Sequence, residues 1–427
     1  MDIRTKALMD FLDGAHSVFH AVAGIEKVLQ ENGYTCLQEQ NKWELIPGGK
    51  YYMTRGGSAV IAFSVPEGQF QGFLMSASHA DRPTFKVKEN GEQVGAYTRL
   101  LVERYGGMLM APWFDRPLSI AGRVLVETEN GVASKLVDID RDLLMIPNVA
   151  IHMNRKANDG YAYNPAVDLL PLMGGKDAKG KLNALLEQEA GGKILGHDLF
   201  LYIRENARVW GVDEEYISAQ AIDDLECAWC CTQGFLKAKP AGSMPVLCVF
   251  DSEEVGSSSL QGAASNLLES VLRRICDSLQ LDYDRALAQS MMVSADNAHA
   301  IHPNHPEYAD AANAPVMGKG IVIKYNANQR YTTDGVTAAL FRKVCQQAQV
   351  PVQTYYNRAD LPGGSTLGNI SLSHVSVPSV DIGLPQLAMH SCYETAAVQD
   401  ALYLEEAMAV YYSSTLSCGN GGEISLK

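Results

Sequence analysis

Six side chains of metal-ligand or acid–base type follow apolar, strand-like segments of the chain. In order they are His79, Asp223, the pair Glu253 and Glu254, Asp296 and His390. Ligands of open parallel sheets bind at the carboxyl ends of the strands, so side chains placed there come together. Two imidazoles and three carboxylates can hold two zinc ions if one carboxylate bridges them. The fourth carboxylate would then be free to act as a base. The order therefore suggests a two-metal hydrolytic site.

Each of these residues also has a purely structural interpretation. A single His near a strand end is more often a hydrogen-bonded structural residue than a ligand. The Glu253–Glu254 pair at a helix start could serve to balance the helix dipole, and Asp223 with Asp224 could form an N-cap. Spacing alone therefore leaves both interpretations open.

The elements that must position these residues alternate between strands and helices. Apolar runs typical of buried strands lie at 59–63, 73–75, 246–250, 321–324 and 378–382. Helical patterns lie at 258–280, 334–348 and 394–414, and the first 35 residues read as one helix ended by Gly33. This alternation predicts an α/β fold with a mainly parallel sheet covered by helices on both faces.

The middle of the chain has a different pattern. Between residues 84 and 202, short strand-like segments alternate with Gly and charged turns, and a helical segment is expected at 183–189. At 427 residues the chain is too long for one compact core. We therefore predict a catalytic domain made of residues 1–83 and 203–427, split by an inserted β-rich domain of residues 84–202.

Composition narrows the classes of function. The chain has 35 Lys and Arg against 49 Asp and Glu, a net charge of −14, which argues against nucleic acid as a partner. No run approaches the roughly 18 apolar residues of a membrane span, and the start lacks the apolar core of a signal peptide. The nine Cys are expected to be reduced thiols in a cytoplasmic protein. The CxxC at Cys227 and Cys230 lies in an apolar helical stretch and is interpreted as core.

Longer strings in the sequence resemble the aspartyl aminopeptidase family of zinc metallopeptidases. The resemblance runs over nearly the whole chain in the right order, and the middle segment matches least well apart from 146–152. The strings that carry it lie at 17–22, 49–55, 251–257, 294–304, 328–331 and 385–391.

This resemblance implies an α/β zinc-peptidase domain split by a β-rich dimerisation domain, with two zinc ions per subunit. One ion would be held by His79 and Asp296, and Asp223 would bridge to the other. The second ion would be held by Glu254 and His390. Glu253 would be the general base that takes a proton from the attacking water. Cobalt or manganese could replace zinc.

The resemblance gives roles to four further residues. Asp81 would hydrogen-bond the ring of His79, although a turn or cap role is the alternative. His152 would reach into a neighbouring subunit and stabilise the oxyanion; the alternative is a structural interface residue. Lys324 would receive an acidic substrate side chain, or else be an ordinary surface charge. His299, which follows Asp296, would line the site.

Two positions depart from the family pattern. The family usually has Asp-Asn where this chain has Asp223 and Asp224, so Asp224 adds a negative group beside the bridging ligand and could alter metal affinity or neighbouring pKa values. Arg82 stands where a small residue is common, and a cation there could touch the substrate.

The activity implied is hydrolysis of an N-terminal Asp or Glu from short peptides. Two alternatives remain: an aminopeptidase or deacylase of the same clan that acts on neutral residues, and a catalytically inactive homologue that forms a shell. The resemblance also implies a homo-oligomer, a tetrahedral dodecamer whose sites face an internal chamber.

Overall fold

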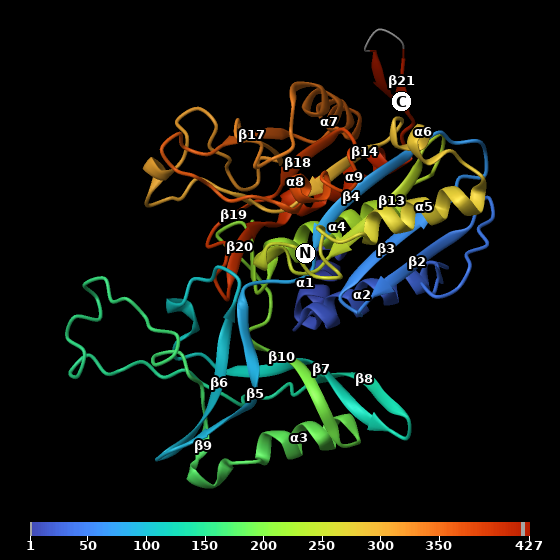
Figure 1. Ribbon diagram of the computed structural model, residues 1–427. Helices are drawn as coiled ribbons and strands as arrows, with labels where there is room; N and C mark the ends of the chain where they lie inside the picture. Colours follow the sequence, from blue (N-terminus) through green and yellow to red (C-terminus); the bar gives the residue numbers. More distant parts are fainter. Residues whose placement is uncertain (1, 420–422) are drawn as a thin grey trace.

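The computed structural model describes residues 2–419 and 423–427, and its largest element is a nine-stranded sheet (Figure 1). Across this sheet the strands are β1 (Thr35–Cys36), β2 (Lys50–Arg55), β3 (Ala59–Ser64), β13 (Met244–Phe250), β4 (Phe73–His79), β14 (Met291–Ala295), β18 (Ser379–Gly383), β16 (Ile321–Tyr325) and β17 (Val352–Tyr356). The central strands β13, β4, β14 and β18 run parallel to one another. The pairs β2–β3, β3–β13 and β16–β18 are antiparallel. The expected α/β fold is confirmed, with a mixed sheet whose centre is parallel.

Helices cover both faces of this sheet, because its central strands are apolar on both sides. Successive residues of a strand point to opposite faces, so Leu74 packs in one hydrophobic cluster while Phe73 and Met75 pack in another. The first cluster includes residues of α1 (Ile3–Gly14), α2 (Val18–Glu31), α4 (Ile222–Lys237), α7 (Gly335–Ala348) and α9 (Val398–Ser413). The second includes residues of α5 (Leu267–Leu279), α6 (Tyr283–Leu287) and α8 (Leu367–Ser371).

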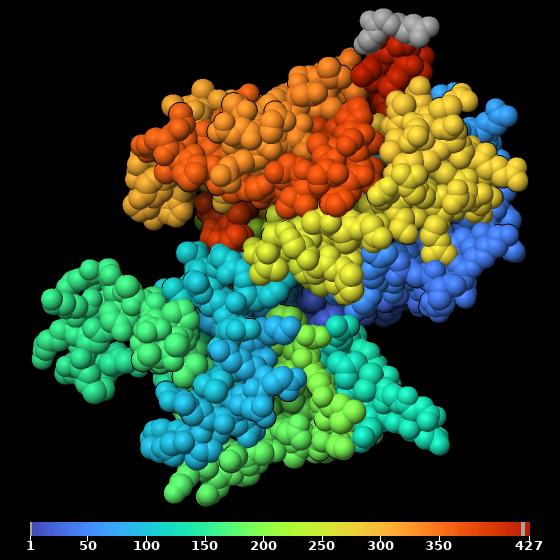
Figure 2. Space-filling model, in the orientation of Figure 1, coloured from blue at the N-terminus to red at the C-terminus, as the bar shows by residue number. Residues whose placement is uncertain are grey.

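The segment between residues 84 and 203 forms a separate six-stranded antiparallel sheet with its own apolar core. Across it the strands are β8 (Gly131–Asp138), β7 (Leu118–Thr128), β10 (Ile194–Ile203), β5 (Thr84–Val94), β6 (Tyr97–Tyr105) and β9 (Leu172–Gly175). Helix α3 (Lys181–Ala190) packs its Leu182 and Leu186 into this core. The ends of the long loop 139–171 pack Leu144, Ile146 and Leu169 into this core, and its middle stretch, residues 147–168, forms the green lobe that stands off from the sheet in Figure 2.

Three small sheets complete the described chain. The first contains β11 (Arg208–Trp210), β12 (Tyr216–Ala219) and β20 (Glu394–Ala397). The second pairs β15 (Ala298–His299) with β19 (Pro385–Gln386), and the third pairs β21 (Leu416–Cys418) with β22 (Ile424–Leu426). Short 3-10 turns occur at Ala111–Trp113, Lys176–Ala178, Glu253–Val255 and Pro306–Tyr308.

Three of the expected helices differ from the structure. The single helix expected over the first 35 residues is two helices, because Ser17 caps a new helix by accepting the N–H of His20. The helix expected from residue 258 begins only at Leu267, after a series of turns. The segment expected to be helical from residue 394 begins as strand β20. The helix at 334–348 is confirmed within one residue.

Candidate metal centre

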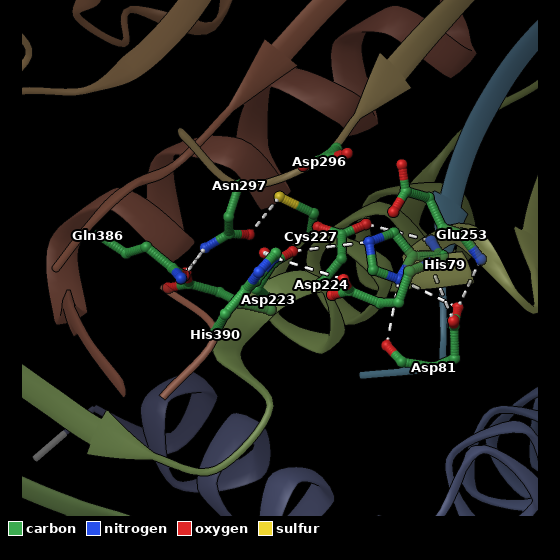
Figure 3. Close-up of polar contacts among 12 residues, drawn as sticks. His79, Asp81, Asp223, Asp224, Cys227, Glu253, Asp296, Asn297, Gln386 and His390 are labelled. Carbon is green, nitrogen blue, oxygen red and sulfur yellow. Dashed lines mark hydrogen bonds and ion pairs between the residues drawn. The ribbon is translucent and has the colours of Figure 1, made fainter. Parts of the chain in front are cut away.

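The side chains expected at the metal site come from five segments of the chain and lie close together (Figure 3). His79 is the last residue of β4, and Asp296 directly follows β14. Glu253 and Glu254 lie in the short turn after β13, at the same edge because β13 and β4 are parallel. Asp223 comes from the first turn of α4 and His390 from the loop after β19.

Asp223 lies between the two imidazoles. His79 Nε2 is 3.6 Å from Asp223 Oδ1, and His390 Nε2 is 3.5 Å from Oδ2. His390 Nε2 is also 3.4 Å from Glu254 Oε2. Ligand atoms of His79, Asp223 and Glu254 can all lie within 4.8 Å of one another. Each Asp223 oxygen thus faces a different imidazole, which is the arrangement a bridging carboxylate needs.

The electrostatics of this cluster call for a cation. Burial and the nearby Asp223 raise the pKa of Glu254 well above its ordinary value. Burial also raises the pKa of Glu253 to about 8, with Asp296 adding to the effect. Burial raises the pKa of Asp223 too, but contacts with His390 and His79 bring it below its usual range. Among the described residues, Asp223 Oδ1 and Glu254 Oε1 are buried without a hydrogen-bond partner. Buried oxygens of this kind cost free energy unless a cation or donor meets them. The residues present therefore fit bound zinc.

Asp81 organises the turn that carries the two glutamates. Its Oδ1 accepts the Glu253 N–H at 3.0 Å, and its Oδ2 accepts the Glu254 N–H at 3.1 Å. The hydroxyl of Tyr105 donates to Oδ2 at 2.8 Å. His79 Nδ1 lies 3.1 Å from the Asp81 carbonyl oxygen and 3.3 Å from Oδ1. Because Nδ1 faces these acceptors, the lone pair of Nε2 is left to face Asp223.

Glu394 is a residue that the sequence pattern did not reveal. It is 1% exposed, and one carboxylate oxygen accepts the His390 N–H at 2.7 Å while the other accepts the Asp223 N–H at 3.0 Å. Burial and the nearby Asp223 raise its pKa to about 8. Glu394 thus ties together two of the candidate ligands. In the sequence, the signal for Glu394 was its position four residues after His390, but it lies in a segment that we expected to be the first turn of a helix.

The additional acid Asp224 lies beneath His79. It is fully buried, its Oδ2 accepts the His79 N–H at 3.1 Å, and a cis peptide bond joins it to Asp223. Burial raises the pKa of Asp224 well above its ordinary value. Its contact is therefore with the backbone of a candidate ligand.

A cavity of about 170 Å³ opens on this cluster, and Asp223, Glu253, Asp296 and His390 line it. His299 and Lys324 line the same cavity. Lys324 is only 2% exposed, so the interpretation as a surface charge is wrong. Its Nζ donates to the Asp296 carbonyl oxygen at 2.7 Å and lies 3.4 Å from Asp296 Oδ1. Burial lowers the pKa of His299, and the nearby Lys324 lowers it further.

Two residues singled out in the sequence lie elsewhere. His152 is exposed in the loop 139–171 and does not line the cavity of its own chain. Arg82 is buried and donates to the Ala15 carbonyl oxygen, so its side chain is directed to the start of α2 and away from this cavity. The expectation that Arg82 touches a substrate here is not supported by its position.

Comparison with known proteins identifies the family. The family described as "Aminopeptidase I zinc metalloprotease (M18)" matches residues 11–412. A protein of Clostridium novyi (strain NT) named "Probable M18 family aminopeptidase 2" is 42% identical over 422 residues, covering 95% of this chain and 98% of the relative. A protein of Stutzerimonas stutzeri (strain A1501) with the same name is 39% identical, covering 97% and 99%.

Solved structures agree. The chain in the cryo-EM structure of the Ape4 and Nbr1 complex is 34% identical, with a TM-score of 0.92 over 96% of this chain and 85% of that one. The crystal structure of an M18 aminopeptidase from Thermotoga maritima shares the fold, with 22% identity and a TM-score of 0.86 over 96% of this chain and 95% of that one. This chain belongs to the M18 family of zinc metallo-aminopeptidases. Within the described residues, none of the helices is long and apolar enough to cross a membrane.

Proposed function

We propose that this protein removes the N-terminal residue, preferably Asp or Glu, from short peptides, using two zinc ions per subunit and Glu253 as the general base. The observation that carries the proposal is the position of Asp223, whose two oxygens face the imidazoles of His79 and His390. A single carboxylate so placed can serve two metal ions at once.

The donor set divides into two groups around Asp223. His79 and Asp296 would hold one ion, and Glu254 and His390 the other. Imidazole and carboxylate are ordinary zinc ligands, and cobalt or manganese accepts the same donors. When bound, the ions polarise the peptide carbonyl and lower the pKa of an attacking water. The backbone contacts of Asp81 and Glu394 keep these side chains in place before any ion arrives.

We assign the proton transfer to Glu253. It lines the cavity beside Asp223 and Asp296, and its backbone N–H is fixed by Asp81. In the metal-free protein burial raises its pKa to about 8, and bound cations would lower that pKa toward the ionised form that a base needs. Glu253 takes the proton of the attacking water and passes it to the leaving amine. His299, on the same cavity wall, is placed to contact the substrate.

Lys324 supports the preference for acidic residues. It is a buried cation on the cavity wall, so an Asp or Glu side chain that enters is attracted to it. One observation favours the alternative, an aminopeptidase for neutral residues. Nζ lies within 3.4 Å of three oxygens of Asp296 and Asn297, so its three N–H donors already have acceptors.

A panel of aminoacyl p-nitroanilides separates the two specificities. With zinc, cobalt or manganese, we expect the aspartyl and glutamyl substrates to give the largest kcat/KM. Lys324→Met should lower kcat/KM for the aspartyl substrate at least tenfold more than for the alanyl substrate. Lys343→Met, which changes an exposed lysine of α7, is the matched control. Equal losses for both substrates, with the metal content unchanged, would assign Lys324 to holding Asp296 and favour the neutral specificity.

We also propose that residues 84–202 form an oligomerisation domain of a tetrahedral homo-dodecamer, and that His152 acts in a neighbouring subunit's site. The middle of the loop, residues 147–168, stands off from the six-stranded sheet (Figure 2), and it includes the exposed apolar side chains of Val149, Ile151 and Met153. The mApe1 protein of S. cerevisiae, which shares this fold, was solved as a dodecamer. Light scattering coupled to size exclusion tests the assembly, and an active monomer would contradict it.

A further inference from the structure

A second cavity lies where the start of α2 meets strands β5 and β10, and it has no part in the proposed reaction. Its volume is about 190 Å³. None of the candidate metal ligands lines it, although Asp81, which holds the Glu253 turn, does. The cavity lies between the nine-stranded sheet's helical layer and the six-stranded sheet.

One wall of this cavity carries a buried cation with an unused donor. Arg82 is 8% exposed, and its Nη1 donates to the Ala15 carbonyl oxygen at 2.6 Å. Among the described residues its Nη2 is buried without a hydrogen-bond partner. Since Ala15 lies three residues before α2, this contact places the guanidinium at the start of that helix. A buried charged donor left unpaired is costly, which points to a missing acceptor.

The start of α2 adds two more donors at the same wall. The helix begins at Val18, and the side chain of its cap Ser17 accepts the N–H of His20. The N–H groups of Val18 and Phe19 precede the first intrahelical hydrogen bond, and both residues line the cavity. They also lie at the positive end of the helix dipole, where anions bind.

The acids around the cavity are already engaged, with one exception. Asp198 accepts Lys86 Nζ at 2.8 Å and Arg123 Nε at 2.9 Å, so one positive charge is left among these three, and Arg82 adds a second against the carboxylates of Asp81 and Asp251. Asp81 accepts two backbone N–H groups and one hydroxyl. Asp251 is the remaining carboxylate in the lining, and its Oδ1 accepts the N–H of the neighbouring Ser252 at 2.6 Å.

We propose that this cavity binds a small oxyanion that carries a proton, with the chemistry of monohydrogen phosphate. The guanidinium of Arg82 and the N–H groups of Val18 and Phe19 would donate to its oxygens, and Asp251 would accept from its hydroxyl. The bound anion would join α2 to the segment between β4 and β5, and so stabilise the contact between the two sheets.

Titration of the metal-loaded protein with inorganic phosphate tests this site. We expect saturable binding by calorimetry and a rise in the thermal midpoint. Arg82→Met should weaken phosphate binding at least tenfold and remove the rise. Arg342→Met, on the exposed face of α7, should behave as the wild type. Phosphate that binds only at the metal ions would bind all three proteins equally, and that result would overturn the proposal.

A second variant removes a donor without removing the arginine. Val18→Pro deletes one N–H at the first helical position, where Pro is well tolerated. Ser17 before it has φ −148° and ψ 167°, a conformation that suits a residue preceding Pro. This variant should bind phosphate several-fold more weakly while keeping its peptidase activity. Sulfate has no proton for Asp251 and should bind more weakly than phosphate. Unchanged phosphate affinity in Val18→Pro, or sulfate binding as tight as phosphate, would overturn the assignment.

Discussion

The two sheets of this protein differ in where their charged side chains lie. At the edge of the nine-stranded sheet, His79, Asp223 and Asp296 are 7% exposed or less, and two carboxylate oxygens of the cluster lack partners among the described residues. The six-stranded sheet has an apolar core, and pairs such as Lys193 with Glu127 lie on its exposed surface. Buried charge without compensation is expensive. The difference therefore separates a sheet edge whose buried charges are suited to metal ions from a sheet whose core is built for packing.

The largest effect is expected from the bridging carboxylate. Asp223→Asn keeps the shape of the side chain but removes the charge, so the metal content should fall below two ions per subunit. We expect kcat/KM to fall by about 10³-fold or more, since both metal functions depend on this group. Circular dichroism should show an unchanged fold. Full metal content and activity in Asp223→Asn would show that the buried charge of Asp223 is not needed to bind the ions, and the contrast between the two sheets would then fail.

Removal of the metals should make stability fall as pH rises. Glu226 is a buried residue of α4 whose carboxylate accepts the side-chain N–H of Asn297 at 2.9 Å. Burial raises the pKa values of Glu226 and Glu394 from 4.5 to about 8, so the folded, metal-free protein binds more protons than the unfolded chain. The stability from these groups is fully present below pH 4.5 and is lost between pH 4.5 and 8, at up to about 1.4 kcal/mol per pH unit for each group.

Urea unfolding of the chelator-treated protein at several pH values measures this slope. The metal-loaded protein should show a shallower slope, because the ions compensate Asp223, which is one cause of the raised pKa of Glu394. A metal-free protein that becomes more stable between about pH 5 and 8 would contradict this assignment.

The loop of the second sheet offers a test of a role in the neighbouring site. If His152 acts in a neighbouring subunit's site, an oligomer made only of His152→Ala subunits has complete metal sites, but none of these sites receives an imidazole from a neighbour. Oligomers assembled from His152→Ala and Glu253→Gln subunits should recover several-fold more activity than either variant alone. A mixture no more active than the sum of its parts would confine His152 to a structural role.

The smallest effect is expected at the surface of the six-stranded sheet. Lys193 and Glu127 lie 3.0 Å apart, and their side chains are 65% and 48% exposed. Lys193→Met should change the free energy of unfolding by less than about 1 kcal/mol and leave kcat/KM unchanged. A large loss of activity would show that charge on this sheet also takes part in catalysis.

The sequence predicted the positions of those site residues that stand directly at the ends of apolar strands. His79 and Asp296 come directly at strand ends, and the central strands are apolar runs, so their positions could be predicted from the pattern, although spacing alone left their role open. Glu394 could not, because its role depends on a hydrogen bond to Asp223, 171 residues away. The contacts of Lys324 could not be predicted for a similar reason, since its partner Asp296 comes from a different strand end. The break between α1 and α2 required the cap at Ser17 to be noticed inside a continuous apolar pattern.

The most direct test of the central claim is turnover and metal content of one variant, Glu253→Gln. Because Glu253 is assigned to proton transfer and the metals to other side chains, this variant should hold two zinc ions per subunit by elemental analysis. Its kcat for aspartyl p-nitroanilide should fall by about 10²–10⁴-fold, the range expected for loss of a general base. Full turnover with both ions bound would contradict the role of Glu253.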